Sequence, residues 1–283
     1  MQDQIPFPSY SLKLMRACVE KSNDMAKTLL QNADVLSMLF SILKDNRTEI
    51  YDSVLQSTVG IFSNLVPSKD LKLILLCEQD FLGDVASLIE TANSYLGNHS
   101  YEMSHLLLQL LDILNHILKK VEEPVKRVLS SKGARKTGSP SANDTEQLLQ
   151  ETKHLSKLDG ILMNLLIAHD SDIQEWACRC LYLSAELYGG SQDECNLTID
   201  NIESLVSAVK SSGLGSRKRQ KLLLRILKRF LQTNEFCQQY AMESPALKDL
   251  SQGLLSSTKD STDQDSKSVR QMATDLIEKW TKK

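Results

Sequence analysis

The stretch that most constrains the fold of this chain runs from residue 158 to residue 190, LDGILMNLLIAHDSDIQEWACRCLYLSAELYGG. Its first part is apolar almost all round, as expected of a short buried helix. After the polar turn His169–Asp172, whose last residues can cap a helix, apolar residues recur at helical spacing from Ile173 onward. We expect Trp176 on the buried face of this second helix. Such a helix pair cannot bury its own apolar surface, so it must stack on similar pairs.

Long amphipathic helices begin at regular intervals in the rest of the chain. The predicted starts are Ile50, Tyr101, Ile173, Arg217 and Ser268. Three of the four spacings, about 44 to 51 residues, fit the repeat length of armadillo and HEAT proteins, and one is longer, about 72 residues. The sequence therefore predicts an all-α, right-handed α-solenoid of about five armadillo/HEAT-like helical repeats. We expect it to form a single domain over residues 1–283.

The long spacing contains an insertion, residues 130–145, after a helix that we expect to end at Val121. The insertion, SSKGARKTGSPSANDT, has no apolar periodicity and is rich in Ser, Gly, Lys and Arg, which predicts a disordered surface loop. Thr137 and Ser139 lie close after basic residues, and Ser139 precedes a proline, as in kinase target sites. A plain linker and a phosphorylated segment both remain open as interpretations.

The first predicted helix, Tyr10–Glu20, is amphipathic but stands alone. It has the pattern of the third helix of a repeat without the two helices before it, so one of its faces would be left open. We expect either that the chain is part of a longer solenoid or that the residues before Tyr10 fold over the open face.

Composition excludes several classes of protein. The net charge of −3 argues against a general binder of polyanions. The N-terminus does not resemble a signal peptide, and no apolar run is long enough to span a bilayer, so we expect no membrane association. The six cysteines are scattered and mostly occupy apolar helical positions, which predicts buried free thiols in a reducing compartment. We therefore expect a cytoplasmic location, with the cilium, centrosome or nucleus as alternatives.

Residues that carry chemistry are not clustered in the sequence. Cys178 and Cys180 are two apart on a helix and point to different sides, and no Cys-x-x-Cys motif occurs. His105 and His116 would lie about 16 Å apart along a helix, too far to share a metal ion. The chain has no G-x-S-x-G elbow and no phosphate-binding loop. We predict no metal, no cofactor and no enzymatic activity.

The strongest charge feature is a basic run between Lys210 and Gln232, which contains eight cations and no acid. On a helix, Arg217, Lys221, Arg225 and Lys228 form one stripe with Lys218 alongside, opposite an apolar side. The first interpretation is a solvated face. The second is a surface for an acidic or phosphorylated segment of a protein partner. The third is a nucleic-acid adaptor using the helix over residues 217–231, which we disfavour because no aromatic side chains are interleaved for stacking.

The stretch over residues 158–187 resembles the armadillo repeat most clearly, with its apolar helix, short acidic turn and long third helix. In armadillo proteins that bind extended peptides, third helices line a concave groove and an asparagine near their end bonds the ligand backbone. Asn64 resembles that residue, and Asn115 matches its place loosely. The central repeat has Leu183 there, so the resemblance does not imply a regular asparagine ladder as in importins.

The opening Pro6–Leu14, PFPSYSLKL, followed by Glu-Lys-Ser-Asn, is similar to the C-terminal armadillo-like region of the Fused and Unc-51-like-4 family of kinases and pseudokinases. This resemblance implies a scaffold linked to cilia or Hedgehog signalling, as a regulatory region of a larger protein. No kinase motif is present in the chain. A tubulin-binding HEAT array is another alternative, but such arrays use Trp and Lys in loops at the repeat edges, whereas Trp176 is predicted on a helix.

Overall fold

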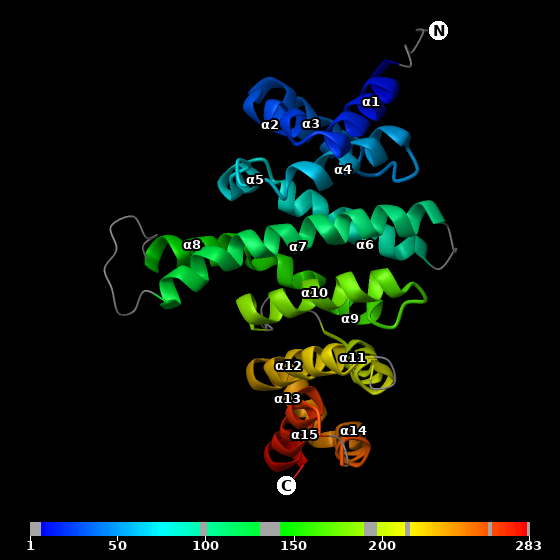
Figure 1. Ribbon diagram of the computed structural model, residues 1–283, viewed down its shortest axis with the longest axis vertical. Helices are drawn as coiled ribbons and strands as arrows, with labels where there is room; N and C mark the ends of the chain where they lie inside the picture. The colour runs from blue at the N-terminus through cyan, green and yellow to red at the C-terminus, as the bar shows by residue number, and fades with distance from the viewer. Residues whose placement is uncertain are drawn as a thin grey trace. The chain divides into compact units, whose positions relative to one another are not determined.

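The computed structural model describes residues 7–96, 101–130, 142–189, 197–212, 216–259 and 262–281 (Figure 1). Every regular element in these ranges is a helix, which confirms the all-α prediction. Of the elements, η2 is a 3₁₀-helix and η3 a π-helix. In chain order they are α1 (Phe7–Lys21), α2 (Asn23–Gln31), α3 (Ala33–Asn46), α4 (Ser53–Leu65), α5 (Leu73–Glu78), α6 (Phe81–Tyr95), α7 (Tyr101–Ser130), α8 (Ala142–Thr152), η2 (Lys153–Leu158), α9 (Asp159–Leu165), α10 (Ser171–Tyr188), α11 (Ile199–Ser212), α12 (Arg217–Thr233), α13 (Glu235–Glu243), α14 (Pro245–Ser257), α15 (Gln264–Leu276) and η3 (Ile277–Thr281).

The chain forms two compact units, unit 1 (Met1–Thr152) and unit 2 (Lys153–Lys283). Each unit has its own set of packed helices, and the single domain over residues 1–283 stays a prediction. Among the described residues, no helix combines the length and the apolar character needed to cross a membrane.

Unit 1 stacks its long third helices side by side. α1 packs along α4, and α4 packs along α7, while the second helices α3 and α6 contact one another behind them. As predicted, α1 takes the place of a third helix, and its Tyr10 and Leu14 are 72% and 67% exposed. Phe40, Phe62 and Phe81 come from α3, α4 and α6 and form the aromatic centre of the unit, with Phe62 stacked on Phe40 at a ring-centroid distance of 5.1 Å.

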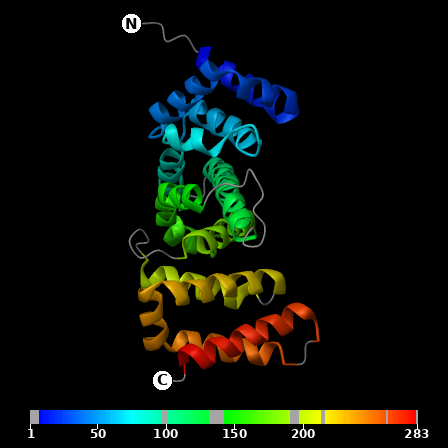
Figure 2. The same cartoon turned by 90° about the vertical axis from the view of Figure 1, so that its left-hand side faces the viewer.

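Unit 2 repeats the same arrangement. The third helices α10, α12 and α15 pack side by side, and the second helices α9, α11 and α14 form the layer behind them. α13 runs across the direction of α12 and α15 (Figure 2). Polar side chains tie the layers together. The Ser184 hydroxyl on α10 donates to the buried Asp159 carboxylate at 2.6 Å, and the Asn201 amide on α11 donates to the Gly160 carbonyl at 3.1 Å.

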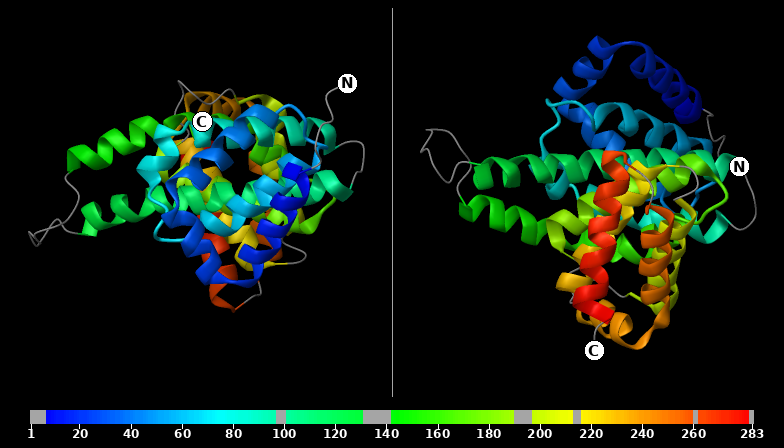
Figure 3. Two further views of the ribbon diagram at one scale, coloured as in Figure 1. Left: turned by 90° about the horizontal axis from the view of Figure 1, so that it is seen from above. Right: turned by 60° about the horizontal axis from the view of Figure 1, so that its bottom comes forward.

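The helix before the predicted insertion is longer than expected, and the helix after it begins earlier. α7 does not end at Val121 but continues to Ser130, with Pro124 inside it. The ion pair between Glu122 and Lys126, 2.7 Å apart, spans the proline and supports the helix on either side of it. At the other end, α8 begins at Ala142, inside the expected loop, and packs back along α7 (Figures 1 and 3).

The start of α10 also differs from the prediction. The capping residue is Asp170, whose carboxylate accepts from the backbone N–H groups of Asp172 at 2.8 Å and Ile173 at 3.3 Å. The helix therefore begins at Ser171, two residues earlier than expected. A carboxylate at the N-cap satisfies amides that have no partner within the helix.

Candidate binding surface on the third helices

α12 carries the basic run, and its apolar side anchors it in unit 2. Ser216 caps the helix by accepting from the backbone N–H of Arg219 at 3.3 Å. The buried side consists of leucine, isoleucine and phenylalanine at helical spacing, which leaves the cations on the remaining surface. The buried apolar residues are Leu223, Leu224, Ile226, Leu227, Phe230 and Leu231.

Two lysines of α12 form ion pairs with acids of the neighbouring third helix α15. Lys221 Nζ lies 3.0 Å from Asp265 Oδ1, and Lys228 Nζ lies 2.7 Å from Asp275 Oδ2. The hydrogen bond from Lys228, with a second one from Gln271, lowers the pKa of Asp275 below its ordinary value. The basic run thus has acidic partners, although none of them is near it in the sequence.

Three arginines of α12 donate to carbonyls at the C-terminal ends of other helices. Arg217 bonds Ser257 O at the end of α14 at 3.2 Å, and Arg219 bonds Leu166 O at the end of α9 at 3.4 Å. Arg229 bonds Ala185 O in the last turn of α10 at 3.3 Å, although this carbonyl also accepts from the backbone N–H of Gly189 at 3.0 Å. The last carbonyls of a helix lack partners within it and carry partial negative charge, so a guanidinium satisfies both needs. These arginines act as cross-links between helices.

Lys218 and Arg225 differ from the other cations of α12. Both side chains are exposed and form no ion pair with the described residues. They lie two helical turns apart on one face, with Lys221 and Lys228 beside them. We name these four residues the α12 ridge. Arg217, which the sequence placed in the same stripe, instead turns toward the end of α14.

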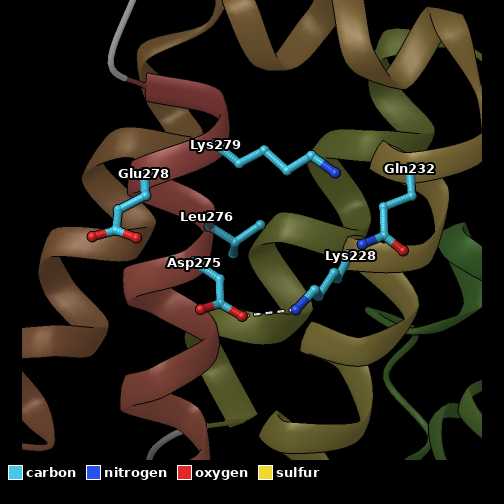
Figure 4. A pocket seen from close by; sticks show the side chains of 6 residues that line it. All are labelled: Lys228, Gln232, Asp275, Leu276, Glu278 and Lys279. Atoms are coloured by element: carbon cyan, nitrogen blue, oxygen red, sulfur yellow. Dashed lines mark hydrogen bonds and ion pairs between the residues drawn. The ribbon is translucent and has the colours of Figure 1, made fainter.

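A pocket of about 370 Å³ lies between α12 and the end of α15. Figure 4 shows the paired Lys228 and Asp275 on one side of it, with Leu276 between the two helices and Gln232 across from Lys279. The pocket therefore combines a small apolar wall with charges of both signs, and Glu278, which also lines it, directs its carboxylate away from the other side chains (Figure 4). An anionic ligand would meet the Asp275 carboxylate, and Lys228 is already paired with it, so the pocket itself does not favour an anion.

Trp176 was predicted to be buried, and this was wrong. Its side chain is only partly buried on the face of α10, where the Arg179 guanidinium lies 5.0 Å from the ring centroid. Arg179 also pairs with Glu175 at 3.0 Å. The buried face of α10 lies one residue further on, at Ala177, so the ring projects beside the core and is a candidate contact for a partner.

The two asparagines carried over from the armadillo resemblance lie in different settings. Asn64 is half-buried, and its amide donates to Gly60 O in its own helix at 2.8 Å. Asn115 is 1% exposed, and neither its amide nitrogen nor its carbonyl oxygen has a hydrogen-bond partner. A side chain so buried does not present its amide at the surface of unit 1.

The remaining candidate residues that the structure describes do not form a chemical centre. Thr137 and Ser139 lie outside the described residues. Within the described ranges, no group of three or more His, Cys, Asp or Glu side chains could hold a metal ion. Cys178 and Cys237 are buried free thiols, and burial raises the pKa of each to about 12. Cys18 and Cys77 are half-buried, less than the sequence predicted.

Solved structures share this arrangement of helices. A designed armadillo repeat protein superposes with a TM-score of 0.53 over 98% of this chain and 95% of its own, at 17% sequence identity. An engineered protein from a structural genomics consortium gives a TM-score of 0.50, with 95% and 90% covered and 16% identity. The fold is an armadillo-type α-solenoid. At these identities the likeness concerns the fold alone.

The sequence itself is similar to a much longer protein. It is 32% identical over 235 residues to the serine/threonine-protein kinase ULK4 of Mus musculus. The match covers 81% of this chain but only 18% of the kinase, so the chain spans less than a fifth of that relative. This confirms the resemblance to the Fused and Unc-51-like-4 family. No protein-family model matches the chain.

Proposed function

We propose that this chain is a non-enzymatic protein-interaction scaffold that binds an acidic or phosphorylated segment of a partner protein along the α12 ridge. The observation that carries the proposal is the pair of exposed cations Lys218 and Arg225, which no acid in the described part of unit 2 neutralises. Carboxylates or phosphates of a partner would complete the charge-assisted hydrogen bonds that these side chains lack.

The neighbouring residues support this proposal. Lys221 and Lys228 are already paired, but their side chains remain 23% and 36% exposed, so an incoming anion can share them. Trp176 lies partly exposed on α10, the third helix that packs next to α12, and offers an apolar contact beside the charges. Stacked repeats provide the extended surface on which such a segment can lie.

The similarity to a kinase bears on the larger setting of the chain. We propose that the chain is a regulatory region of a larger signalling protein, in the cytoplasm or at the cilium. Kinase activity forms no part of the proposal, because the match covers a small fraction of the kinase and the chain contains no kinase motif.

Charge reversal of the two unpaired cations tests the proposal. Lys218→Glu with Arg225→Glu should abolish affinity capture of a partner that the wild type retains at low salt. The matched control, Lys248→Glu with Lys259→Glu, makes the same change in net charge at exposed lysines on and just after α14. Capture by wild type should weaken as salt shortens the Debye length from about 10 Å to about 3 Å.

A direct assay separates a protein ligand from a nucleic acid. Fluorescence anisotropy should show that wild type binds a labelled phosphoserine- and glutamate-rich peptide more tightly than a single-stranded oligonucleotide of equal length. Tighter binding of the oligonucleotide would favour the adaptor alternative. Equal capture of the partner by wild type and by Lys218→Glu with Arg225→Glu would show that the α12 ridge does not bind the partner and is a solvated face.

A further inference from the structure

A second pocket of unit 2, of about 330 Å³, lies where α11 ends, α12 begins and α14 ends. Its apolar part comes from Leu250 and Leu254 of α14, and its charged part includes Lys210 and Arg217. The volume is at the lower end of the about 300–1,000 Å³ of small-ligand pockets. It suits a single side chain with its adjoining polar group better than a large cofactor.

The guanidinium of Arg217 is held in place at this pocket by a buried amide. Gln220 is 2% exposed, its amide donates to Val209 O at 3.0 Å, and its carbonyl oxygen accepts from Arg217 Nη1 at 2.7 Å. A guanidinium has five N–H donors in a fixed plane, and the two hydrogen bonds to Gln220 and Ser257 engage only part of that set. Arg217 is therefore preorganised and retains donors for a ligand.

Gly253 forms part of the pocket wall and has no evident structural role. It lies inside α14, has no positive φ, and a Cβ added to it would meet nothing within 4 Å. Each of the other glycines in the described ranges either faces a close neighbour or has a positive φ. Glycine in a helix interior is destabilising relative to alanine. Its effect at position 253 is to keep the pocket open.

We propose that this pocket binds the side chain of a leucine or isoleucine in an acidic segment of a partner protein. An aspartate or glutamate next to that residue then accepts hydrogen bonds from Arg217. The pocket lining carries two cations, Lys210 and Arg217, against one acid, Asp249, which favours an anion beside the apolar anchor. The nature of the ligand rests on the proposed function.

The occupant is an internal segment and not a chain terminus. Arg217 is followed along α12 by Lys218 and, two turns later, by Arg225, both exposed. Three cations along the helix can pair with several carboxylates of one ligand. An acidic internal sequence supplies several carboxylates, whereas a chain terminus supplies a single one. The pocket thus provides an apolar anchor at one end of the surface proposed above.

Nuclear magnetic resonance with blocked dipeptides tests the ligand chemistry on the full chain. Titration with N-acetyl-Asp-Leu-amide should shift the backbone amide signals of Gly253 and Leu254. N-acetyl-Ser-Leu-amide, which lacks the carboxylate, should bind about tenfold more weakly, the loss expected when a charge-assisted hydrogen bond is removed. Equal binding of the two would overturn the role of Arg217. If N-acetyl-Ser-Leu with a free carboxyl end binds more tightly than N-acetyl-Asp-Leu-amide, the ligand is a chain terminus, and the proposal of an internal segment is refuted.

Filling the pocket tests its location. Gly253→Leu should abolish the shifts while the melting temperature stays equal or rises, because the added side chain meets open space and leucine favours helix. Gln252→Leu places the same side chain on the neighbouring exposed position of α14 and should bind as wild type.

The outcomes separate this pocket from the proposed function. Unchanged dipeptide binding by Gly253→Leu would overturn the pocket, whatever the ridge variant does. If Gly253→Leu destabilises the fold, Gly253→Ala should still weaken binding without lowering the melting temperature. If both variants lower the melting temperature, the position is not open, and the argument from Gly253 is refuted. If Gly253→Leu loses dipeptide binding while Lys218→Glu with Arg225→Glu leaves partner capture unaffected, that result would support the pocket and refute the α12 ridge as the partner site.

Discussion

Two cations one helical turn apart on α12 should respond differently to charge reversal. Lys221 is paired with Asp265 at 3.0 Å, whereas Arg225 is exposed and unpaired among the described residues. From the sequence alone, we would expect both reversals to leave the fold unaffected. From the structure, we expect Lys221→Glu to destabilise unit 2 and Arg225→Glu to leave it unchanged or slightly stabilised.

The magnitude follows from the position of each charge. The Lys221 and Asp265 side chains are 23% and 28% exposed, so their attraction is close to that of a surface pair, about 0.2–1 kcal/mol. Reversal removes this attraction and adds a repulsion of similar size, which gives a loss of about 0.4–2 kcal/mol. Glutamate at position 225 instead lies three and four residues from Lys228 and Lys221, a spacing that contributes about 0.2–0.5 kcal/mol per opposite-charge pair.

Thermal unfolding followed by circular dichroism measures the difference. In a unit of this size a loss of 1 kcal/mol corresponds to roughly 4 °C, so Lys221→Glu should melt about 2–8 °C below Arg225→Glu. The double exchange Lys221→Glu with Asp265→Lys should recover most of the loss. Equal melting temperatures for the two single variants, or no recovery in the exchange, would refute the ion pair as the cause.

Three further predictions follow from burial. Trp176→Ala should lower the free energy of unfolding, measured by chemical denaturation, by less than Leu181→Ala does. Leu181→Ala removes a fully buried side chain, which costs about 2–5 kcal/mol. Equal losses would show that Trp176 is part of the core. Burial outweighs the hydrogen bond from Arg47 and raises the pKa of Asp84, so the folded state binds the proton more tightly than the unfolded chain. The stability of wild type relative to Asp84→Asn should therefore rise as the pH falls from neutral toward the ordinary carboxyl pKa of about 4, and a fall would contradict the sign. Finally, a thiol reagent followed by peptide mass spectrometry should modify Cys18 well before Cys178 or Cys237, whose pKa values of about 12 leave little thiolate; simultaneous labelling would argue against their burial.

Helical periodicity predicted most of the fold, because burial in a solenoid repeats with the helix period. The predicted starts of the third helices agree with α4, α7, α10, α12 and α15 to within about four residues. The end of α7 could not be predicted in the same way. A proline usually ends a helix, but the pairs formed by Glu122 and Glu123 with residues four positions on continue it past Pro124.

The candidate site was only partly predictable, because a sequence shows a charge without its partner. The acids that pair with Lys221 and Lys228 lie 44 and 47 residues further along the chain. Trp176 was misplaced for a related reason. It lies on the boundary of the apolar stripe of α10, and its exposure depends on which neighbour covers that boundary.

The basic character of α12 is in large part a consequence of its place between other helices. A third helix in a solenoid lies beside the ends of the helices before and after it, and helix C-termini present unpaired carbonyls. Arg217 and Arg219 each bond a carbonyl at such an end. Arg229 adds a hydrogen bond to Ala185 O, which also accepts from the backbone N–H of Gly189. Lys120 likewise bonds a carbonyl in unit 1, where its Nζ donates to Ser68 O at 2.6 Å in the turn that follows α4.

Some cations of α12 take no part in this structural role and have no partner among the described residues. Three arginines of α12 bond carbonyls, and two of its lysines pair with acids of α15. The two remaining cations of α12 are Lys218 and Arg225, which lie seven residues apart on one face. Lys221 and Lys228 are already paired with acids of α15, so their removal tests stability before it tests binding. For this reason the ridge variant changes only the two uncompensated cations, and a loss of binding in that variant cannot be attributed to a broken fold.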